Sequence, residues 1–419
     1  MIQMVNLFSG FDDTDKGFHA RLVTEIPRNG PIGGKAKMTI EKHNIQTPAI
    51  LLDLDVLERN IGRYHQMAVA GGKKLWPMIK THKSTEIAQM QLNHGATGFL
   101  CGTLDECEAI CENIVRGQKK DISIMYAYPV ASFPNISRVI KLAGACNFYL
   151  RIDNYKQALL LNKAASEAGV HINYTVIINC GLNRFGVTAS EAAELVEKIA
   201  DLNNIKFCGI STHPGHVYGE TDFEGVAKIA RQESDIMKNA ATVLNNIGIT
   251  PKLISSGSTP THTHIADDAV INCLHPGNYV FMDNMQVALD CAKEKDCALT
   301  VLTTVISARP GEFIIDAGAK CFGLDKGAHG NSKIKGHGWV KNQDENMLTI
   351  SSLSEEVGKI TVSDACKDRI SLQIGDKLEI IPNHSCAVAN NTSCYVAIRN
   401  DIFDRLIHVD MRGNSAIKI

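Results

Sequence analysis

Residues 148–179 have the sequence FYLRIDNYKQALLLNKAASEAGVHINYTVIIN. The short apolar runs at 148–153 and 174–179 predict buried strands. Between them the pattern predicts a helix that begins after Asp153, a good N-terminal cap, and ends at Gly169, which tolerates a left-handed turn. Two strands joined by one helix run parallel in the same sheet, with a right-handed crossover.

Similar units lie on both sides of this segment. Apolar runs typical of strands occur at residues 49–54, 75–80, 98–102, 122–128, 207–212 and 252–257. Helical patterns between them include residues 56–70, 84–95 and 105–115. Eight strands alternating with helices favour an α/β fold with a closed (β/α)8 TIM-type barrel, the alternative being an open doubly wound sheet. In both architectures we expect the functional groups at the C-terminal ends of the strands.

The pattern changes after about residue 293. The β-branched runs at 298–309, 312–318, 347–353, 358–362, 376–383 and 394–400 are separated by Gly, Asp, Asn and Pro. Such runs are typical of antiparallel strands. We therefore predict three parts: an N-terminal extension (1–46), the barrel (47–292) and a mostly antiparallel β domain (293–419). The extension contains the turn-rich segment IPRNGPIGGK, which indicates an arm rather than a domain.

The composition excludes several functional classes. Of the 419 residues, 44% are apolar and 21% charged, which is an ordinary globular balance. A net charge of −2 gives no electrostatic footprint for nucleic acid, and no apolar run approaches the roughly eighteen residues of a membrane span. The thirteen cysteines are scattered without a CxxC pair, and the N-terminus lacks the pattern of a signal peptide. We therefore expect free thiols in a reducing cytoplasm.

The most informative single residue is Lys80, which ends the apolar run 75–80. A lysine at the mouth of a barrel, partly desolvated or beside another cation such as Lys83, has a lowered pKa and can form a Schiff base with a carbonyl. The alternative is that basic residues end the strand and remain solvated.

Two later loops add to this interpretation. Gly257, Ser258 and Thr259 follow the run at 252–257, and a second Gly-bearing turn contains Gly277, Asn278 and Tyr279. Backbone donors and hydroxyls at such positions can hold a phosphate, and late barrel strands often carry phosphate sites. A reactive lysine with two phosphate-binding loops suggests pyridoxal 5'-phosphate as the cofactor.

A second chemical group follows the run 376–383. If the backbone stays extended there, His384 and Cys386 lie on the same face, and imidazole with thiolate is a zinc-type donor pair. The alternative is coincidence in a chain with 15 His and 13 Cys. A rival pair, His262 and His264, is explained equally well by a turn.

Other polar residues near strand ends have weaker patterns. Arg184 follows the run at 174–179 and would face a cofactor ring or form a surface ion pair. His213, His216 and Tyr218 would act as acid–base groups or as turn residues bonded to nearby backbone. The remaining candidates would stabilise turns or the contact between domains; these are Asp316, Asp325, Glu355 and Glu356.

Seven separated motifs resemble the family of D-serine dehydratase and D-threonine aldolase, in the family's order. They are TPAILLDLDVLERNI (47–61), PMIKTHKS (77–84), INCGLNRFGV (178–187), SSGSTPT (255–261), HPGNYVFMD (275–283), IIDAGAK (314–320) and IPNHSCAVAN (381–390). The resemblance covers roughly residues 47–400. It implies the fold of alanine racemase and other fold-type III pyridoxal-phosphate enzymes: a barrel followed by a β domain, usually assembled as a homodimer.

The resemblance also implies roles for individual residues. Lys80 matches the lysine that bears the cofactor. His384 and Cys386 match the two protein ligands of a divalent metal, for which zinc suits the donors best and manganese is the alternative. The segments that match the phosphate-binding loops are Gly257–Thr259 and Gly277–Tyr279, with Arg184 and Tyr218 expected beside them. One departure is that this chain has Glu-Glu-Val-Gly at 355–358 where the family often has Glu-Glu-His-Gly.

The implied activity is that of a lyase on small β-hydroxy D-amino acids. The favoured reaction is elimination to a keto acid and ammonia, as by D-serine ammonia-lyase. The reason is that the dehydratases of the family have a His-x-Cys motif, as this chain does, whereas the aldolases have His-x-Asp. The first alternative is retro-aldol cleavage to glycine and an aldehyde, aided by a base such as His216. A further alternative is an amino-acid racemase, which would use the same cofactor lysine but would need no metal. The last alternative is a non-catalytic pyridoxal-phosphate carrier, which would lack the second domain and the metal pair.

Overall fold

The computed structural model describes residues 39–116, 121–327, 331–343, 347–370 and 372–413. Most of the predicted N-terminal extension lies outside these ranges. The residues from Ile40 onward form one unit. Within the described ranges, no helix combines the length and the apolar character that a membrane crossing requires.

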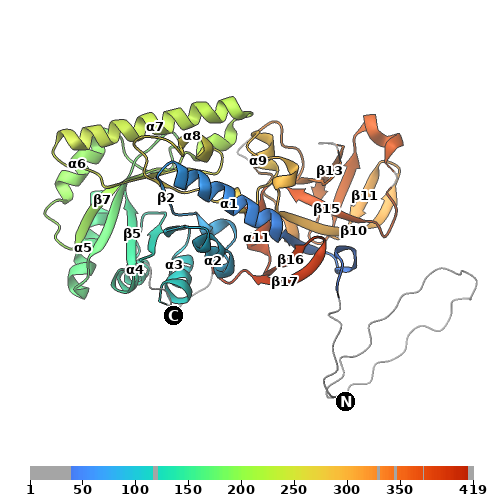
Figure 1. The fold of residues 1–419 in the computed structure, drawn as a ribbon, viewed down its shortest axis with the longest axis horizontal. Coiled ribbons are helices and arrows are strands. Elements are labelled where there is room, and N and C mark those ends of the chain that lie inside the picture. Colours follow the sequence, from blue (N-terminus) through green and yellow to red (C-terminus); the bar gives the residue numbers. More distant parts are fainter. Residues whose placement is uncertain (1–38, 117–120, 328–330, 344–346, 371, 414–419) are drawn as a thin grey trace, which may run out of the picture. The chain divides into compact units, whose positions relative to one another are not determined.

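An eight-stranded parallel sheet forms the left part of Figure 1. Its order is β2-β9-β8-β7-β6-β5-β4-β3. The strands are β2 (Lys74–Leu75), β3 (Gly98–Cys101), β4 (Ser123–Tyr126), β5 (Asn147–Ile152), β6 (Ile172–Ile177), β7 (Ile205–Ser211), β8 (Leu253–Ser256) and β9 (Cys273–Leu274). The sheet closes between its end strands, because the amide of Thr97 donates to Leu75 (3.1 Å) and that of Leu100 donates to Pro77 (2.9 Å). The prediction of a closed barrel is confirmed.

The first helix leads into the barrel, and the helices after it connect the barrel strands and cover them. The helices are α1 (Leu54–Ala70), α2 (Thr85–Asn93), α3 (Leu104–Ile110), α4 (Phe133–Ala145), α5 (Tyr155–Ala168), α6 (Ala189–Ile199), α7 (Phe223–Asn246) and α8 (His262–Ile265). Short helical turns are η2 (Ile79–Thr81), η3 (Cys111–Val115), η4 (Gly215–Gly219) and η5 (Asn278–Val280). Helix α5 is capped by Asn154 rather than Asp153, and it ends at Gly169, whose φ is 65° as a left-handed cap requires.

A second, mostly antiparallel sheet has the order β11-β14-β13-β12-β15-β10-β1-β16-β17. Its strands are β1 (Ala49–Asp53), β10 (Leu299–Arg309), β11 (Glu312–Ile315), β12 (Gly338–Val340), β13 (Leu348–Leu353), β14 (Gly358–Val362), β15 (Lys377–Pro382), β16 (Cys394–Arg399) and β17 (Ile402–His408). The helical elements around it are η1 (Lys42–Asn44), α9 (Asn284–Ala288), η6 (Glu294–Asp296), α10 (Ala319–Phe322), η8 (Asp364–Arg369) and α11 (Ser385–Asn391). The predicted β-rich character of this part is confirmed.

One strand was assigned to the wrong sheet from the sequence, and one barrel strand was not predicted. The run at 49–54 was expected to begin the barrel, but β1 lies in the nine-stranded sheet, antiparallel to β10 and parallel to β16. The eighth barrel strand is instead β9, only two residues long, in a segment for which no strand was predicted. The reason is that β1 is buried along nearly its whole length, and a continuous apolar run fits the centre of any sheet.

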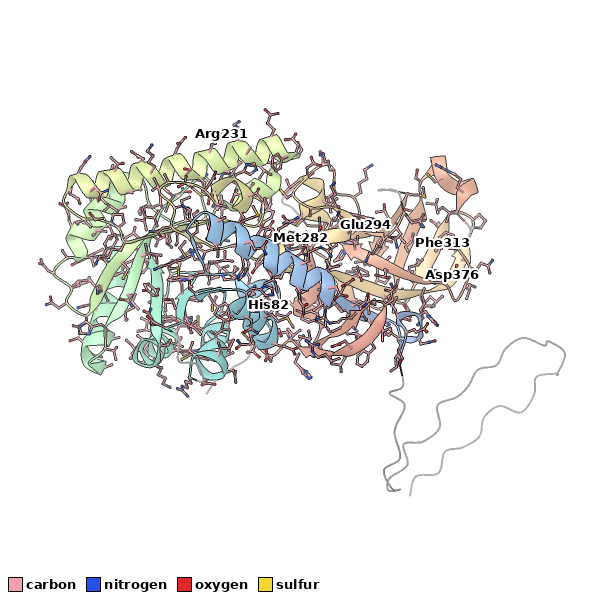
Figure 2. All side chains as sticks on the ribbon, viewed as in Figure 1. His82, Arg231, Met282, Glu294, Phe313 and Asp376 are labelled. Atoms are coloured by element: carbon pink, nitrogen blue, oxygen red, sulfur yellow. The ribbon has the colours of Figure 1, made fainter. Side chains whose placement is uncertain are left out.

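Segments that flank the barrel strands pack into the core of the nine-stranded sheet, whereas the barrel strands pack in a core of their own. Leu57, Ile61 and Tyr64 of α1 belong to the core of the nine-stranded sheet, as do the residues from Tyr279 to Met282. Met282 and Phe313, both labelled in Figure 2, belong to this core. Since β1 and α1 connect the sheets before the barrel begins, the predicted division at residues 292 and 293 remains a prediction.

Candidate active site

A cavity of about 250 Å³ lies at the C-terminal ends of the barrel strands, where α11 of the other sheet meets them. Leu100 lies near the end of β3, Arg151 lies in β5 and Gly257 follows β8, so the lining follows the strand ends around the barrel. From the second sheet come His384 and Cys386. The predicted residues that line this cavity are Lys80, Arg184, Tyr218, Gly257, Ser258, Thr259, Gly277, Asn278, His384 and Cys386.

Lys80 lies in the turn η2, two positions after the extended residue Met78, rather than at the end of a strand. Its side chain passes over Gly102 after β3. A Cβ at position 102 would lie 3.0 Å from Lys80 Cβ and 3.4 Å from its Cδ, so glycine leaves the room that the lysine occupies. Lys83 is not a free cation beside it, because its ammonium pairs with Glu106 at 2.9 Å and both side chains are buried.

Arg151 brings a positive charge to the base of the cavity. Its side chain, 3% exposed, projects from β5 into the barrel interior, and Nε approaches Met125 Sδ at 3.3 Å. Burial lowers the pKa of this guanidinium to about 10, so it stays charged at neutral pH. Among the described residues Nη2 has no hydrogen-bond partner, which leaves a donor for an anionic or oxygen-bearing ligand. Sequence reasoning missed this residue, although a charged side chain inside the apolar run FYLRID is unusual.

The residues after β7 take different positions from those expected. Tyr218 and His213 line the cavity, and His213 Nδ1 lies 3.2 Å from the carbonyl oxygen of Gly257. Burial lowers the pKa of His213 to about 3, so this imidazole is neutral at physiological pH. His216 lies outside the lining that the described residues provide, against Gly181 and Gln232.

The two predicted phosphate loops lie together. The hydroxyl of Thr259 accepts hydrogen bonds from the amides of Gly277 (3.3 Å) and Tyr279 (3.0 Å). The Tyr279 side chain turns away into the core, where its hydroxyl accepts from Gln91 at 2.9 Å. At Gly277 a Cβ would lie 3.1 Å from Thr81 Oγ1, so this loop approaches the turn that carries Lys80.

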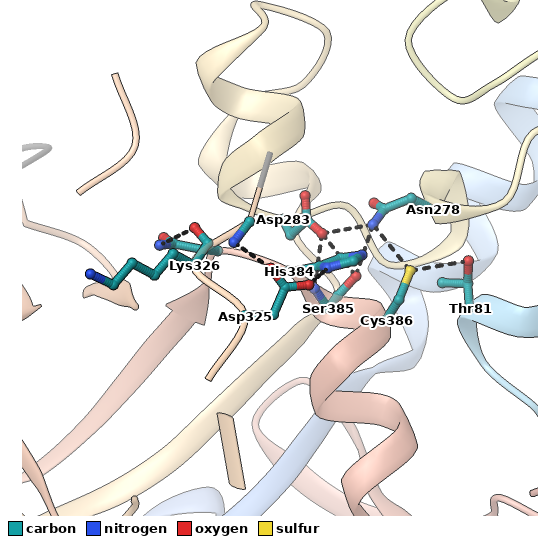
Figure 3. A network of polar contacts seen from close by, with 10 residues as sticks. Thr81, Asn278, Asp283, Asp325, Lys326, His384, Ser385 and Cys386 are labelled. Carbon is teal, nitrogen blue, oxygen red and sulfur yellow. Dashed lines mark hydrogen bonds and ion pairs between the residues drawn. The ribbon is translucent and has the colours of Figure 1, made fainter. Parts of the chain in front are cut away.

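His384 and Cys386 are adjacent, as the sequence predicted, but not through an extended backbone. His384 is the N-terminal cap of α11 and Cys386 lies in its first turn. Figure 3 shows the Asp325 carboxylate bound to His384 Nδ1 at 2.5 Å, whereas Cys386 Sγ lies 3.4 Å from Thr81 Oγ1. A carboxylate on one imidazole nitrogen orients the other nitrogen, as in many metal sites.

The charges of this pair reinforce one another. Burial raises the pKa of the Cys386 thiol, but the His384 charge and hydrogen bonds from His384 and Thr81 outweigh burial, and the net pKa is lowered. Burial lowers the pKa of His384, whereas Cys386 and Asp325 raise it, to a value well above the ordinary one. Thiolate and imidazole are the donors that zinc prefers. No group of three or more His, Cys, Asp or Glu side chains in the described ranges is arranged to hold a metal ion.

The remaining candidates lie away from the cavity. Asp316 accepts from the hydroxyls of Thr47 and Thr303, each at 2.6 Å. Glu355 and Glu356 are exposed and pair with Lys320. The two histidines of the rival pair have different surroundings. His262 is buried against the carbonyl of Tyr64, whereas the ring of His264 contacts the ring of Phe223 at a tilt.

The parallel barrel, the lysine at its C-terminal edge and the donor pair from a β-rich sheet define a protein with the architecture of alanine racemase. Residues 52–285 match the family described as alanine racemase, N-terminal domain, and residues 298–398 match the putative serine dehydratase domain. The chain is 30% identical over 390 residues to D-serine dehydratase of Dictyostelium discoideum (86% of this chain, 95% of the relative). It is 29% identical over 390 residues to 3-hydroxy-D-aspartate aldolase of Paracoccus denitrificans (89% and 94%).

Solved structures agree with these matches. The chain resembles D-threo-3-hydroxyaspartate dehydratase from Delftia sp. HT23 with a TM-score of 0.78 at 27% identity, covering 88% of this chain and 98% of that one. D-threonine aldolase from Filomicrobium marinum has the same fold, with a TM-score of 0.80 at 24% identity and coverage of 92% and 100%. The chain belongs to the family of D-serine dehydratases, D-threonine aldolases and 3-hydroxyaspartate lyases, and the resemblance inferred from its motifs is confirmed.

Proposed function

We propose that this protein is a pyridoxal-phosphate- and metal-dependent lyase that acts on β-hydroxy D-amino acids. One observation carries the proposal: a single cavity is lined by Lys80 from the barrel and by His384 and Cys386 from the second sheet. A cofactor-bearing lysine beside a nitrogen–sulfur donor pair suits a reaction at two adjacent carbons of one substrate. The relatives with matching length are named for such reactions.

The lining of the cavity fits the cofactor. Lys80 would bear it, and the loops at Gly257–Thr259 and Gly277–Asn278 would hold its phosphate. The open donor of Arg151 and the nearby Arg184 and Tyr218 would meet the ring and its oxygen substituents. When bound, pyridoxal phosphate supplies an electron sink for negative charge that develops at the substrate Cα.

The donor pair fits a divalent ion, most suitably zinc. His384 and Cys386 would hold it, with Asp325 orienting the imidazole. Two protein donors leave coordination positions for water and for a substrate hydroxyl, as catalytic zinc sites require. Solved variants of D-threo-3-hydroxyaspartate dehydratase replace a histidine and a cysteine two positions apart, and the cysteine variant is in the metal-free form. The spacing equals that of His384 and Cys386.

The protein side chains would move the protons. The Lys80 amine, released when substrate enters, is the base we assign to the Cα proton. His213 is neutral beside the cavity, and since burial lowers its pKa to about 3 it suits accepting a hydrogen bond there rather than a proton. The predicted role of His216 as a base gains no support from its position against Gly181 and Gln232. Between the two lyase reactions, we favour elimination to a keto acid and ammonia. The reason is that Cys386 gives the chain the His-x-Cys motif of the dehydratases.

Retro-aldol cleavage is the second candidate function, favoured by the 29% identity to an aldolase over most of both chains. Incubation with D-serine, D-threonine and the D-3-hydroxyaspartates distinguishes the two, since elimination releases ammonia and a keto acid, whereas aldol cleavage releases glycine and an aldehyde. The L-enantiomers serve as controls. Racemisation alone, with neither product set formed, would refute the lyase proposal.

We further propose a homodimer in a reducing cytoplasm, with small-molecule substrates and no nucleic-acid or membrane partner. The dimer follows from the family resemblance. The reducing compartment is supported by the cysteines, all thirteen of which lie in the described ranges as free thiols. Light scattering of the purified protein checks the dimer.

A further inference from the structure

Asp283 connects the phosphate loop of the barrel to the segment that carries the metal donors. Its side chain is completely buried. One carboxylate oxygen, Oδ2, accepts from Asn278 Nδ2 (2.7 Å), from the amide of Ser385 (2.9 Å) and from the hydroxyl of Ser385 (3.1 Å), as Figure 3 shows. Asn278 belongs to the predicted phosphate loop, and Ser385 lies between His384 and Cys386.

The same two segments touch at further points. Asn278 Nδ2 also donates to Ser385 Oγ (3.0 Å) and approaches Cys386 Sγ (3.8 Å). The other oxygen of Asp283 caps α9 through the amide of Gln286 (3.3 Å), which fixes the position of the carboxylate. Asn278 Oδ1 is buried and has no hydrogen-bond partner in the part of the chain that the structure describes. This oxygen can therefore accept a hydrogen bond from a ligand bound at the loop.

We propose that Asp283 is a positioning residue that couples cofactor binding to metal binding, so that each ligand raises the affinity for the other. The inference rests on the proposed function, which supplies the two ligands. Its physical basis is that a buried carboxylate cannot replace a lost protein donor with water, so its donors on both sides are held together. A ligand that orders Asn278 therefore also orders Ser385 and the donors beside it.

Thermodynamic linkage makes the proposal quantitative. If the ion raises the affinity for pyridoxal phosphate by some factor, the cofactor raises the affinity for the ion by the same factor. We expect a factor of at least about five, the lower end of usual coupling between sites. Cofactor dissociation constants of metal-free and zinc-loaded protein come from absorbance titration. Zinc dissociation constants with and without pyridoxal phosphate come from competition with a chromophoric chelator.

Variants separate coupling from simple destabilisation. In Asp283→Ala the factor should fall to within about twofold of one. Ser385→Ala is a milder change, which keeps the Ser385 amide and should lower the factor only in part; it keeps the test valid if Asp283→Ala does not fold. Asp316→Ala is the matched control, because Asp316 also accepts two hydroxyls and an amide but lies away from the cavity. This variant should retain the wild-type factor.

The outcomes are distinct. If both ligands bind to the wild type but the factor is one, the inference is wrong and the proposed function stands. If the factor is the same in wild type, Asp283→Ala and Ser385→Ala, Asp283 does not carry the coupling and the inference is also wrong. If pyridoxal phosphate or zinc does not bind at all, the proposed function fails and takes the inference with it.

Discussion

Cys386 of α11 lies against Thr81 of η2, with 3.4 Å between Sγ and Oγ1, although the two residues are 305 positions apart in sequence. Thr81 directly follows Lys80, so this contact sets the proposed metal donor beside the turn that carries the proposed cofactor lysine. The hydroxyl of Tyr395 donates to the carbonyl of His82 at 2.6 Å and holds the same turn from the second sheet. Neither sheet alone can form the cavity.

Lys80 should carry the cofactor. Purified protein loaded with pyridoxal phosphate should be yellow, and after borohydride reduction peptide mass mapping should find the pyridoxyl group on Lys80. Lys80→Ala should lose the colour and the adduct, because the nearby Lys83 is engaged by Glu106 and cannot substitute for it. Labelling of a different lysine in the wild type would overturn the assignment.

Gly277→Ala should weaken cofactor binding. The new Cβ would lie 3.1 Å from Thr81 Oγ1 and 3.2 Å from Met78 Cβ, so the phosphate loop must move away from the Lys80 turn. Overpacking of this kind costs about 1–3 kcal/mol. We therefore expect the affinity for pyridoxal phosphate to fall about tenfold, which corresponds to about 1.4 kcal/mol. Absorbance titration with pyridoxal phosphate measures the change.

The matched control for this prediction is Gly144→Ala in α4. A Cβ there would make an ordinary contact, 3.6 Å from Val170 Cγ1, and alanine favours a helix over glycine by about 1 kcal/mol. Gly144→Ala should therefore stabilise the fold and leave the affinity for the cofactor unchanged. Equal affinities in both variants would show that the loop at Gly277 does not contribute to the site.

The sequence determined the repeating part of the fold well. The runs at 98–102, 148–153 and 207–212 coincide with β3, β5 and β7 within a few residues, because each is a buried parallel strand bounded by polar turns. Residues 49–54 were also a strand, but periodicity does not say which sheet a buried strand joins. Two-residue strands such as β9 leave no periodic signal at all.

The site was predictable where the chemistry is local in sequence. Lys80, the glycine loops and the His-x-Cys pair could be found because each is a short motif. Asp283 could not, and the sequence indicated Asp325 only as a residue that would stabilise a turn or the contact between domains, since their contacts reach across 102 and 59 positions of the chain. Arg151 did leave a signal, a cation within an apolar strand, and a buried cation generally needs a partner or a ligand.

Glu233→Gln should stabilise the protein at alkaline pH but not at acid pH. Burial raises the pKa of Glu233 to about 7 from an ordinary value near 4.5, and Ser256 donates a hydrogen bond to it. The folded protein thus binds the proton more tightly than the unfolded chain, so the free energy of unfolding falls as pH rises from about 4.5 to 7. Glutamine resembles the protonated form and removes this dependence.

The expected gain for Glu233→Gln is up to about 3 kcal/mol at pH 8, since one pKa unit corresponds to about 1.4 kcal/mol. Urea denaturation of both proteins at pH 4.5, 6, 7 and 8 measures it. The difference between variant and wild type should grow through this range and level off above pH 7. A difference that does not change with pH would contradict the raised pKa.

Removal of the metal ion should abolish activity but leave the cofactor bound. Treatment with a strong chelator should abolish lyase activity, because the β-hydroxyl then lacks its Lewis acid. The yellow colour should persist, since Lys80 and the phosphate loops hold the cofactor without the metal, although cofactor affinity should fall by the coupling factor. Re-addition of zinc should restore turnover, with manganese tested beside it.

Cys386→Asp should keep a metal site but change its preference. A carboxylate oxygen is a harder donor than thiolate, so affinity should shift from zinc towards manganese, and competition titrations with both ions measure the shift. By the family resemblance, aldolases have His-x-Asp at these positions. The variant should therefore also form relatively more glycine from D-threonine than the wild type does. Cys386→Ala is the companion variant and should lose the ion. If Cys386→Ala retains both its zinc content and its turnover, the His384–Cys386 pair is not the metal site, and the lyase proposal loses the observation that connects its two ligands.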